Sequence, residues 1–306
     1  MDNHVIDRAT LESLAEAVFS KVPYMELLAW LTDYQSKIKP EDITAKYKTE
    51  LVSPADIESQ TRLVEYFKNS PLFSYCNIRG EEMSENLPSF DPKKEYQIII
   101  DPIDGSPEYA KGGECWGIMI GVCDKAGRNV YSWFVTSTGE LLTSRNVSLV
   151  AHNSFSECAS TKGKILIDVY GYGDEVLTAR AKSEIQSRLG GLGDFAQFTS
   201  LPAALWAARD VVTGKSSGLL WLPSTMGKGG YPDYDLVFLD AVQRAGLKVM
   251  MARTDETPEG SEGKVQMFAI ASTDDDLAIL WKSGVSALGD AYNPAWKIDT
   301  KDLIIT

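Results

Sequence analysis

The chain has 306 residues, of which 44% are hydrophobic and 24% are charged, a composition that suits a globular protein with one large core or two packed subdomains. Lysine and arginine total 30 and aspartate and glutamate total 43, so the net charge of −13 argues against binding to nucleic-acid polymers or to anionic membranes. Only two histidines are present, which argues against histidine-ligated zinc and against a Ser-His-Asp triad.

The four cysteines are scattered and include no Cys-x-x-Cys pair, which favours a cytoplasmic protein with buried thiols. The charged, amphipathic segment from Met1 to Val18 lacks the apolar core of a signal peptide. No apolar run approaches the ~18 residues that a membrane helix needs. We therefore expect a cytoplasmic protein without a membrane partner.

In the first half of the chain, helix signals come first and strand signals follow. Apolar residues recur at helical spacing near the start, and Ser53-Pro54 is typical of a helix beginning, with Ser53 as the N-cap. The apolar, β-branched run that ends at Ile100 is typical of a buried strand. The predicted helices lie over 7–20, 24–38 and 53–69, and the predicted strands over 96–100, 116–123 and 129–136.

In the second half, strand and helix signals alternate, which suggests an α/β layer. The predicted strands lie over 164–169, 218–222, 247–252 and 266–271, and the predicted helices over 178–189, 201–212, 234–245 and 273–283. A polar stretch over 153–163 places a boundary near residue 155. We expect an N-terminal α+β subdomain over 1–155, with most of the candidate site, and a C-terminal α/β subdomain over 156–306.

The hexapeptide Asp101-Pro102-Ile103-Asp104-Gly105-Ser106 directly follows a predicted strand. Pro102 restricts the backbone and Gly105 allows a tight turn, so two carboxylates three residues apart can point at one spot. Unpaired carboxylates at a buried strand end would raise each other's pKa and cost stability, and a hard cation such as Mg²⁺ removes that problem. A surface turn is the alternative interpretation, because Asp, Pro and Gly are also common turn residues.

Three other acidic segments accompany the hexapeptide. A predicted helix begins with Asp56, Gly80-Glu81-Glu82 precedes the hexapeptide by one loop, and Tyr234-Asp235 opens a later predicted helix that ends at Ala245-Gly246. In this order the segments resemble the inositol monophosphatase superfamily, which includes fructose bisphosphatases and bisphosphate nucleotidases. The resemblance covers about residues 50–125 and 197–250.

The resemblance implies a layered αβαβα sandwich with mixed sheets, of the α/β (α+β) class, and a phosphatase that uses two or three Mg²⁺ ions. Glu81, Asp101 and the Ile103 carbonyl would hold one ion. Asp101, Asp104 and Asp235 would hold a second, and Glu81 would help to hold a weakly bound third. Crowding among these acids predicts that Asp104→Asn leaves the metal-free protein equally stable or more stable.

For catalysis, the resemblance implies that Asp56 and Ser106 orient and deprotonate the attacking water, with Glu81 as a further catalytic residue. Gly105 and Ser106 would receive phosphate oxygens. Ser200, which precedes the helix predicted over 201–212, would face the substrate. Water activated by metal ions needs no covalent enzyme intermediate.

The last metal ligand has competitors in the sequence. Asp235 lies eleven residues before Gly246, where the family has twelve, and Asp233 and Asp240 are close by. Asp235 keeps the aromatic-Asp pair of the family. On the predicted helix it would also share a face with apolar residues, so we favour it over the other two.

The substrate stays open between an inositol phosphate, a 3′,5′-bisphosphate nucleotide and a sugar phosphate. Residues 107–114 resemble the bisphosphate nucleotidase branch, and the stretch 222–232 displaces the region where inositol-specific enzymes carry a sugar-contacting glutamate. The expected partner is a small phosphorylated metabolite, with inhibition by lithium implied, and a homodimer is allowed because family members are often dimers. The alternative function is a metal- or nucleotide-binding protein on the same fold that has lost catalysis.

Overall fold

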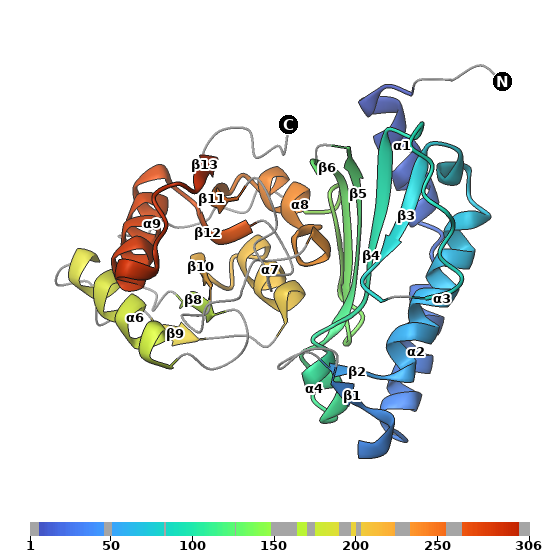
Figure 1. Ribbon diagram of the computed structural model, residues 1–306, viewed down its shortest axis with the longest axis horizontal. Coiled ribbons are helices and arrows are strands. Elements are labelled where there is room, and N and C mark those ends of the chain that lie inside the picture. The colour runs from blue at the N-terminus through green and yellow to red at the C-terminus, as the bar shows by residue number, and fades with distance from the viewer. Residues whose placement is uncertain are drawn as a thin grey trace.

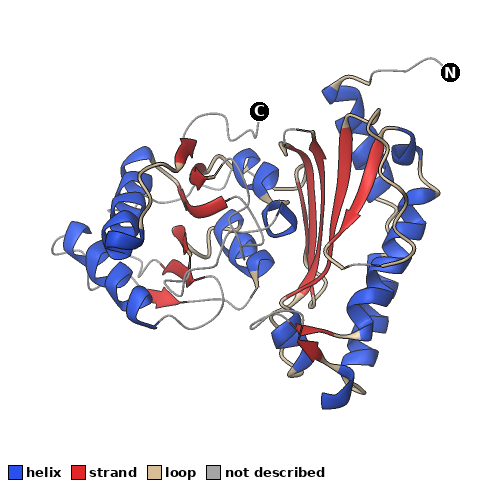
Figure 2. Ribbon diagram, viewed as in Figure 1, coloured by secondary structure: helices blue, strands red, loops and turns tan. Residues whose placement is uncertain are grey.

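The computed structural model describes residues 6–45, 51–82, 84–125, 127–147, 164–169, 175–189, 197–199, 203–223, 233–254 and 265–299. In these residues helices and mixed β-sheets alternate as layers, which confirms the expected αβαβα sandwich (Figure 1 and Figure 2). Among the helices described, none combines the length and the apolarity that crossing a bilayer requires. The boundary predicted near residue 155 lies outside the described residues and stays a prediction.

The N-terminal half is a five-stranded sheet covered by helices on its outer face (Figure 1). Its elements are α1 Arg8–Phe19, α2 Tyr24–Gln35, α3 Pro54–Lys68, β3 Cys76–Gly80, β4 Tyr96–Asp104, β5 Gly117–Asp124, β6 Asn129–Thr136 and β7 Leu141–Thr143. The strand order is β3-β4-β5-β6-β7, in which β3 and β4 are parallel and the other neighbours antiparallel. Shorter elements connect them: η1 Pro40–Asp42, β1 Thr44–Ala45, β2 Leu51–Val52, η2 Pro71–Ser74 and α4 Ser106–Ala110.

Helices α1 and α3 begin where the local sequence signals predict. Asp7 caps α1 by accepting a backbone N–H of the first turn at 2.9 Å, and Ser53 caps α3, with Pro54 in the first helical position. The two helices also pack against each other on the sheet, where the ring centroids of Phe19 and Phe67 lie 5.1 Å apart. Caps and an apolar face together place these helices.

The C-terminal half contains a six-stranded mixed sheet. Its elements are β8 Lys164–Val169, α6 Glu175–Leu189, β9 Gln197–Thr199, α7 Ala204–Val212, β10 Gly218–Leu222, η4 Asp233–Leu236, α8 Leu239–Arg244, β11 Lys248–Arg253, β12 Val265–Ala271, α9 Asp274–Leu288, η5 Gly289–Ala291 and β13 Lys297–Asp299. The strand order is β13-β11-β12-β10-β8-β9, with β8 parallel to both β10 and β9. In Figure 1, α7 and α8 lie between the two sheets, and α6 and α9 cover the far face of the second sheet.

Hydrophobic clusters fill the spaces between these layers. Trp133 belongs to the cluster under α1, α2 and α3, whereas its neighbour Phe134 belongs to the cluster between the two sheets. Successive side chains of a strand point to opposite faces, so β6 contributes to both clusters. The first sheet is therefore buried on both faces, with one face toward the C-terminal half.

Most of the predicted elements are confirmed, and β6, β8 and β10 match to the residue. The single helix predicted over 234–245 is wrong, because η4 and α8 are separated by a turn at residues 237 and 238. The cause is Ser132 of β6, whose hydroxyl accepts the Ala241 N–H at 3.3 Å and donates to the Val237 carbonyl oxygen at 2.5 Å. A continuous helix would join that N–H and that carbonyl to each other.

Candidate active site

Four carboxylates gather where β4 meets η4. Carboxylate oxygens of Asp101, Asp104 and Asp235 all lie within 4.8 Å of one another. Asp101 and Asp104 are buried at the end of β4, whereas Asp235 comes from η4 in the other half of the chain. Glu81, directly after β3, hydrogen-bonds to the carboxyl group of Asp101. The structure thus brings together the four acidic side chains that the sequence proposes as metal ligands.

An irregularity in β4 lets Asp101 and Asp104 share one face of the sheet. Residues three apart on a regular strand point to opposite faces. The pairing of β4 with β5 shifts between Asp101, which pairs with Met119, and Asp104, which pairs with Gly117, so β4 carries one extra residue there. Ile103 accordingly packs in the cluster under the N-terminal helices, while Asp104 points to the C-terminal half. The strand predicted over 96–100 therefore continues to Asp104.

Burial and crowding raise the pKa of Asp101 well above its ordinary value. Desolvation is the largest cause, and the negative charges of Glu81, Asp104 and Asp235 follow. Each of these causes penalises the ionised carboxylate. A hard divalent cation relieves the penalty, because it takes oxygen ligands and neutralises their charge. The donor set of clustered carboxylates therefore fits Mg²⁺.

Asp104 also connects the two halves of the molecule. Its Oδ1 accepts the Ala204 N–H at 3.1 Å, and its Oδ2 accepts the Leu205 N–H at 2.7 Å, at the start of α7. The N-cap residue of α7 is Ala203, whose side chain makes no capping hydrogen bond. A carboxylate at this position satisfies N–H groups that have no partner within the helix, and the helix dipole favours its charge. Asp104 is therefore both a candidate metal ligand and the cap of α7.

Asp56 is a buried carboxylate in the first turn of α3. Its Oδ2 accepts the backbone N–H and the hydroxyl of Ser53, both at 2.7 Å, which completes the capping box of α3. Its Oδ1 accepts the hydroxyl of Ser106 at 2.8 Å. Burial raises the pKa of Asp56, although the hydrogen bonds from Ser53 and Ser106 oppose the rise. A buried carboxylate paired with a hydroxyl is suited to accepting a proton.

Ser106 begins α4, and Gly105 before it makes this turn possible. Gly105 has a φ of 86°, in the left-handed region that glycine adopts without strain. A Cβ at this position would lie 2.6 Å from the Cys115 carbonyl oxygen and 2.9 Å from the Cβ of Ala203. Backbone conformation and space therefore both require glycine at this position of the hexapeptide.

Gln60, which the sequence analysis missed, holds the loop that carries Glu81. It is buried on α3, where it accepts the Glu82 N–H at 2.9 Å and donates to the Glu82 carbonyl oxygen at 2.7 Å. The loop passes so close that a Cβ on Gly80 would lie 1.9 Å from the amide oxygen of Gln60. Gln60 follows Asp56 by four residues and so shares its helix face. That spacing is the signal that could have identified it.

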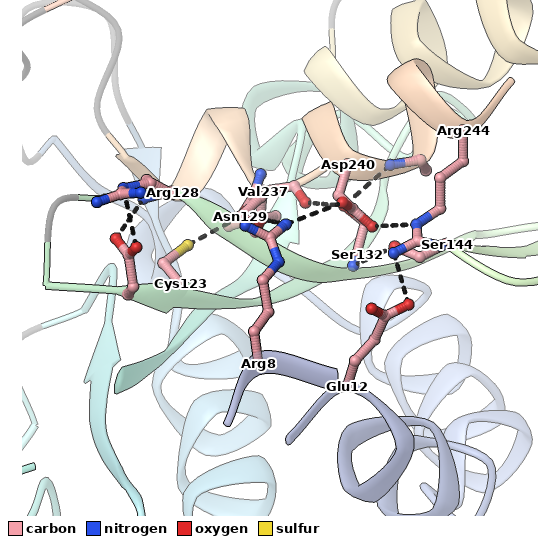
Figure 3. A network of polar contacts seen from close by, with 12 residues as sticks. Arg8, Glu12, Cys123, Arg128, Asn129, Ser132, Ser144, Val237, Asp240 and Arg244 are labelled. Atoms are coloured by element: carbon pink, nitrogen blue, oxygen red, sulfur yellow. Dashed lines mark hydrogen bonds and ion pairs between the residues drawn. The ribbon is translucent and has the colours of Figure 1, made fainter. Parts of the chain in front are cut away.

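The remaining candidates are Ser200, Asp233 and Asp240. Ser200, the proposed substrate contact, lies outside the described residues, and the side chain of Asp233 is not described. Asp240 belongs to a separate ion-pair network, because its carboxylate accepts Nε of Arg244 at 2.7 Å and lies 3.8 Å from Arg8 of α1 (Figure 3). Of the two competitors to Asp235, Asp240 is thus committed to other partners.

Comparisons with known proteins identify a family that matches part of this chain. The sequence model of the inositol monophosphatase family matches residues 25–171, just under half of the chain. No curated protein matches the sequence.

Solved structures of low identity share the fold. The extragenic suppressor protein suhB from Bartonella henselae has a TM-score of 0.66 and 13% identity, and the match covers 91% of this chain and 99% of that one. A Staphylococcal inositol monophosphatase-1 has a TM-score of 0.61 and 15% identity, with 94% and 98% covered. An IMPase/NADP phosphatase has a TM-score of 0.58 and 16% identity, with 94% and 98% covered. These matches confirm the fold, and the family match confirms the resemblance drawn from the motifs.

Proposed function

We propose that this chain, whose residues 25–171 match the sequence model of the inositol monophosphatase family, is a phosphatase that hydrolyses a phosphate monoester on a small soluble metabolite with the help of Mg²⁺. One observation carries the proposal: the carboxylate cluster adjoins a hydroxyl–carboxylate pair, Ser106 and Asp56. The Ser106 hydroxyl also lies 2.8 Å from the carbonyl oxygen of Ile103, the residue directly before Asp104 of the cluster. The cluster supplies oxygen ligands for cations, and the pair supplies a route for a proton. The hydrolysis of a phosphate ester by water needs both.

Glu81, Asp101 and the Ile103 carbonyl would hold one Mg²⁺ ion, and Asp101, Asp104 and Asp235 a second, with Glu81 also beside a weakly bound third. When bound, the ions neutralise phosphate oxygens and make a water acidic enough to attack at neutral pH. One solved structure with this fold is described as complexed with Mg²⁺ and phosphate, and another as an inhibitory complex soaked with lithium chloride. We therefore also expect lithium to inhibit this protein.

Ser106 and Asp56 would take the proton from the attacking water. The Ser106 oxygen would accept a hydrogen bond from that water and pass its own hydrogen to Oδ1 of Asp56, 2.8 Å away. Burial raises the pKa of Asp56, so its carboxylate accepts a proton more readily than a solvated aspartate does. Glu81 would help to orient the same water.

Gly105 and Ser106 would bind the phosphate group through backbone N–H groups at the start of α4. The first N–H groups of a helix have no partner within it and lie at the positive end of its dipole. The next residue, Pro107, lacks an N–H, so the donors of this turn belong to Gly105 and Ser106. Ser200 would contact the rest of the substrate.

The experiment that tests the proposal measures phosphate release from a panel of bisphosphate nucleotides, inositol phosphates and sugar phosphates. Release should require Mg²⁺, stop in EDTA and fall by orders of magnitude in Asp101→Asn. Full activity in excess chelator would contradict the metal mechanism. Binding of Mg²⁺ without release from any substrate would favour the alternative, a metal- or nucleotide-binding protein that has lost catalysis.

A further inference from the structure

Asp235 reaches the acidic cluster from η4, a single short turn in the other half of the molecule. A 3-10 turn has poorer hydrogen-bond geometry than an α-helix and does not by itself hold a side chain in one place. A metal ligand needs such a hold, because metal affinity depends on how the surrounding groups orient the ligand. The groups that hold η4 in place therefore help to determine where the Asp235 carboxylate lies.

Two side chains of β6 bind the backbone immediately after Asp235. Asn129 donates through Nδ2 to the Leu236 carbonyl oxygen at 2.8 Å, and the Ser132 hydroxyl donates to the Val237 carbonyl oxygen at 2.5 Å. Both side chains are almost fully buried, at 3% and 0% exposure, so water does not compete for these bonds. Figure 3 shows Asn129 and Ser132 on the strand, with Val237 above them.

A bulge in β6 turns both side chains toward η4. Asn129 and Ser132 are three residues apart and would point to opposite faces of a regular strand. The pairing of β6 with β5 shifts between Tyr131, which pairs with Val122, and Asn129, which pairs with Cys123, so one extra residue sits between them. Val130 and Tyr131 accordingly both pack in the cluster on the helix side. The bulge leaves Asn129 and Ser132 on the face toward the C-terminal half.

Ser132 also separates η4 from α8. Its hydroxyl accepts the Ala241 N–H at 3.3 Å and donates to the Val237 carbonyl oxygen. It thereby replaces the direct hydrogen bond between these two groups that would continue a helix. The regular pattern resumes only when Val242 donates to the Phe238 carbonyl oxygen at 3.2 Å. Because of this interruption, η4, which carries Asp235, does not continue into α8 as one helix.

The neighbouring strand completes the contact with the turn. A Cβ on Gly121 of β5 would lie 2.7 Å from the Cβ of Val237, so the close approach of the turn requires glycine. Cys123 lies 2.9 Å from Oδ1 of Asn129. With the amide oxygen engaged by that thiol, the NH₂ group faces the Leu236 carbonyl.

We propose that Gly121, Asn129 and Ser132 form a socket that positions Asp235 and thereby sets the affinity of the site for the ion that Asp235 helps to hold. The proposal rests on the proposed function. The socket acts through the backbone of residues 236 and 237, so its members are positioning residues. Loss of such an outer partner typically weakens metal binding about tenfold to a hundredfold.

The test compares Ser132→Ala with Ser283→Ala. Ser283 is a matched control on α9, since its hydroxyl is also buried and also donates to a backbone carbonyl oxygen, that of Ile279, at 2.7 Å. Binding of Mn²⁺ is titrated by electron paramagnetic resonance, and the Mg²⁺ dependence of phosphate release is measured in parallel. Ser132→Ala should bind Mn²⁺ about tenfold to a hundredfold more weakly. Saturating Mg²⁺ should restore most of its kcat, and Ser283→Ala should bind Mn²⁺ as the wild type does.

Asn129→Ala is the second variant, in case Ser132→Ala does not fold, and it should shift Mn²⁺ binding in the same direction. If a folded socket variant binds Mn²⁺ as tightly as Ser283→Ala, the socket proposal is wrong and the proposed function stands. If the wild type binds Mn²⁺ and releases no phosphate, the binding comparison still decides the socket. If the wild type binds no divalent cation, the proposed function fails and the socket proposal fails with it.

Discussion

The hydroxyl oxygen of Ser106 lies 2.8 Å from Oδ1 of Asp56, and it lies equally far, 2.8 Å, from the carbonyl oxygen of Ile103. A serine hydroxyl has one hydrogen, so it donates to one of these acceptors at a time. A cation bound to the Ile103 carbonyl oxygen would draw electron density from it and make it a poorer acceptor, which favours donation to Asp56. Metal binding would in this way select the direction in which Ser106 passes a proton.

Ser106→Ala should therefore lower kcat by about a hundredfold to ten-thousandfold, the usual contribution of a positioned general base. Ser106→Thr keeps the hydroxyl and should keep most of the activity. Ser106→Ala also takes a hydrogen-bond donor from the buried Asp56 carboxylate, so it should lower the melting temperature, whereas Ser106→Thr should keep it. Steady-state phosphate release at saturating Mg²⁺ measures the effect. An alanine variant with the kcat of the wild type would show that the pair takes no part in proton transfer.

The stability of the metal-free protein should fall as the pH rises above about 3.8, the ordinary pKa of an aspartate. Burial and the neighbouring acids raise the pKa of Asp101 in the folded state, so the folded protein keeps a proton that the unfolded chain releases. Folding then binds protons, and stability is lost progressively until the pH passes the folded-state pKa. Thermal melts in EDTA at a series of pH values measure this slope.

Asp101→Asn is the control for that slope, since an amide does not titrate, and it should flatten the pH dependence in EDTA. Mg²⁺ should stabilise the wild type more at neutral pH than at acidic pH, because only the deprotonated carboxylates bind the ion. Equal slopes for wild type and Asp101→Asn would mean that other groups account for the pH dependence.

Asp104→Asn should destabilise the metal-free protein, contrary to the expectation from crowding alone. The carboxylate of Asp104 accepts two N–H groups at the start of α7, and an amide keeps only one acceptor oxygen. Loss of a cap costs about 0.5–2 kcal/mol. The relief of repulsion is smaller, because the raised pKa of Asp101 already lets a proton neutralise part of the charge. Chemical denaturation in EDTA decides the sign, and a variant at least as stable as the wild type would restore the crowding argument.

The parts of the fold that the sequence predicts are those with local signals. Asp7 and Ser53 cap α1 and α3 through bonds within one helical turn, so the residues that form each cap are neighbours in the sequence. The carboxylate cluster was predictable for another reason. All of its members are aspartate or glutamate. Carboxylates that crowd a buried strand end are costly unless they bind a cation, so the pattern indicates a metal site.

The parts that the sequence could not predict depend on distant pairing. The bulges of β4 and β6 are shifts in register against β5, and a register is a property of two strands. The division of the helix predicted over 234–245 depends on Ser132, which lies 105 residues before the carbonyl of Val237 that it binds. Apolar periodicity continues across the break, so the helical pattern in that segment gives no sign of it.

The proposed last metal ligand, Asp235, is tested against its two competitors, Asp233 and Asp240. Asp235 lies with Asp101 and Asp104, whereas the buried Asp240 accepts Nε of Arg244 at 2.7 Å. Asp235→Asn should abolish turnover and weaken activation by Mg²⁺. It should leave the metal-free protein at least as stable as the wild type, because one of the charges that raise the pKa of Asp101 is removed.

Asp240→Asn should keep kcat and lose about 1–2 kcal/mol of stability, since it weakens a charged hydrogen bond that is partly open to water. Asp233→Asn should cost less activity than Asp235→Asn. Phosphate release and denaturation of all three variants separate the roles, and an active Asp235→Asn beside an inactive Asp233→Asn would move the ligand two residues earlier.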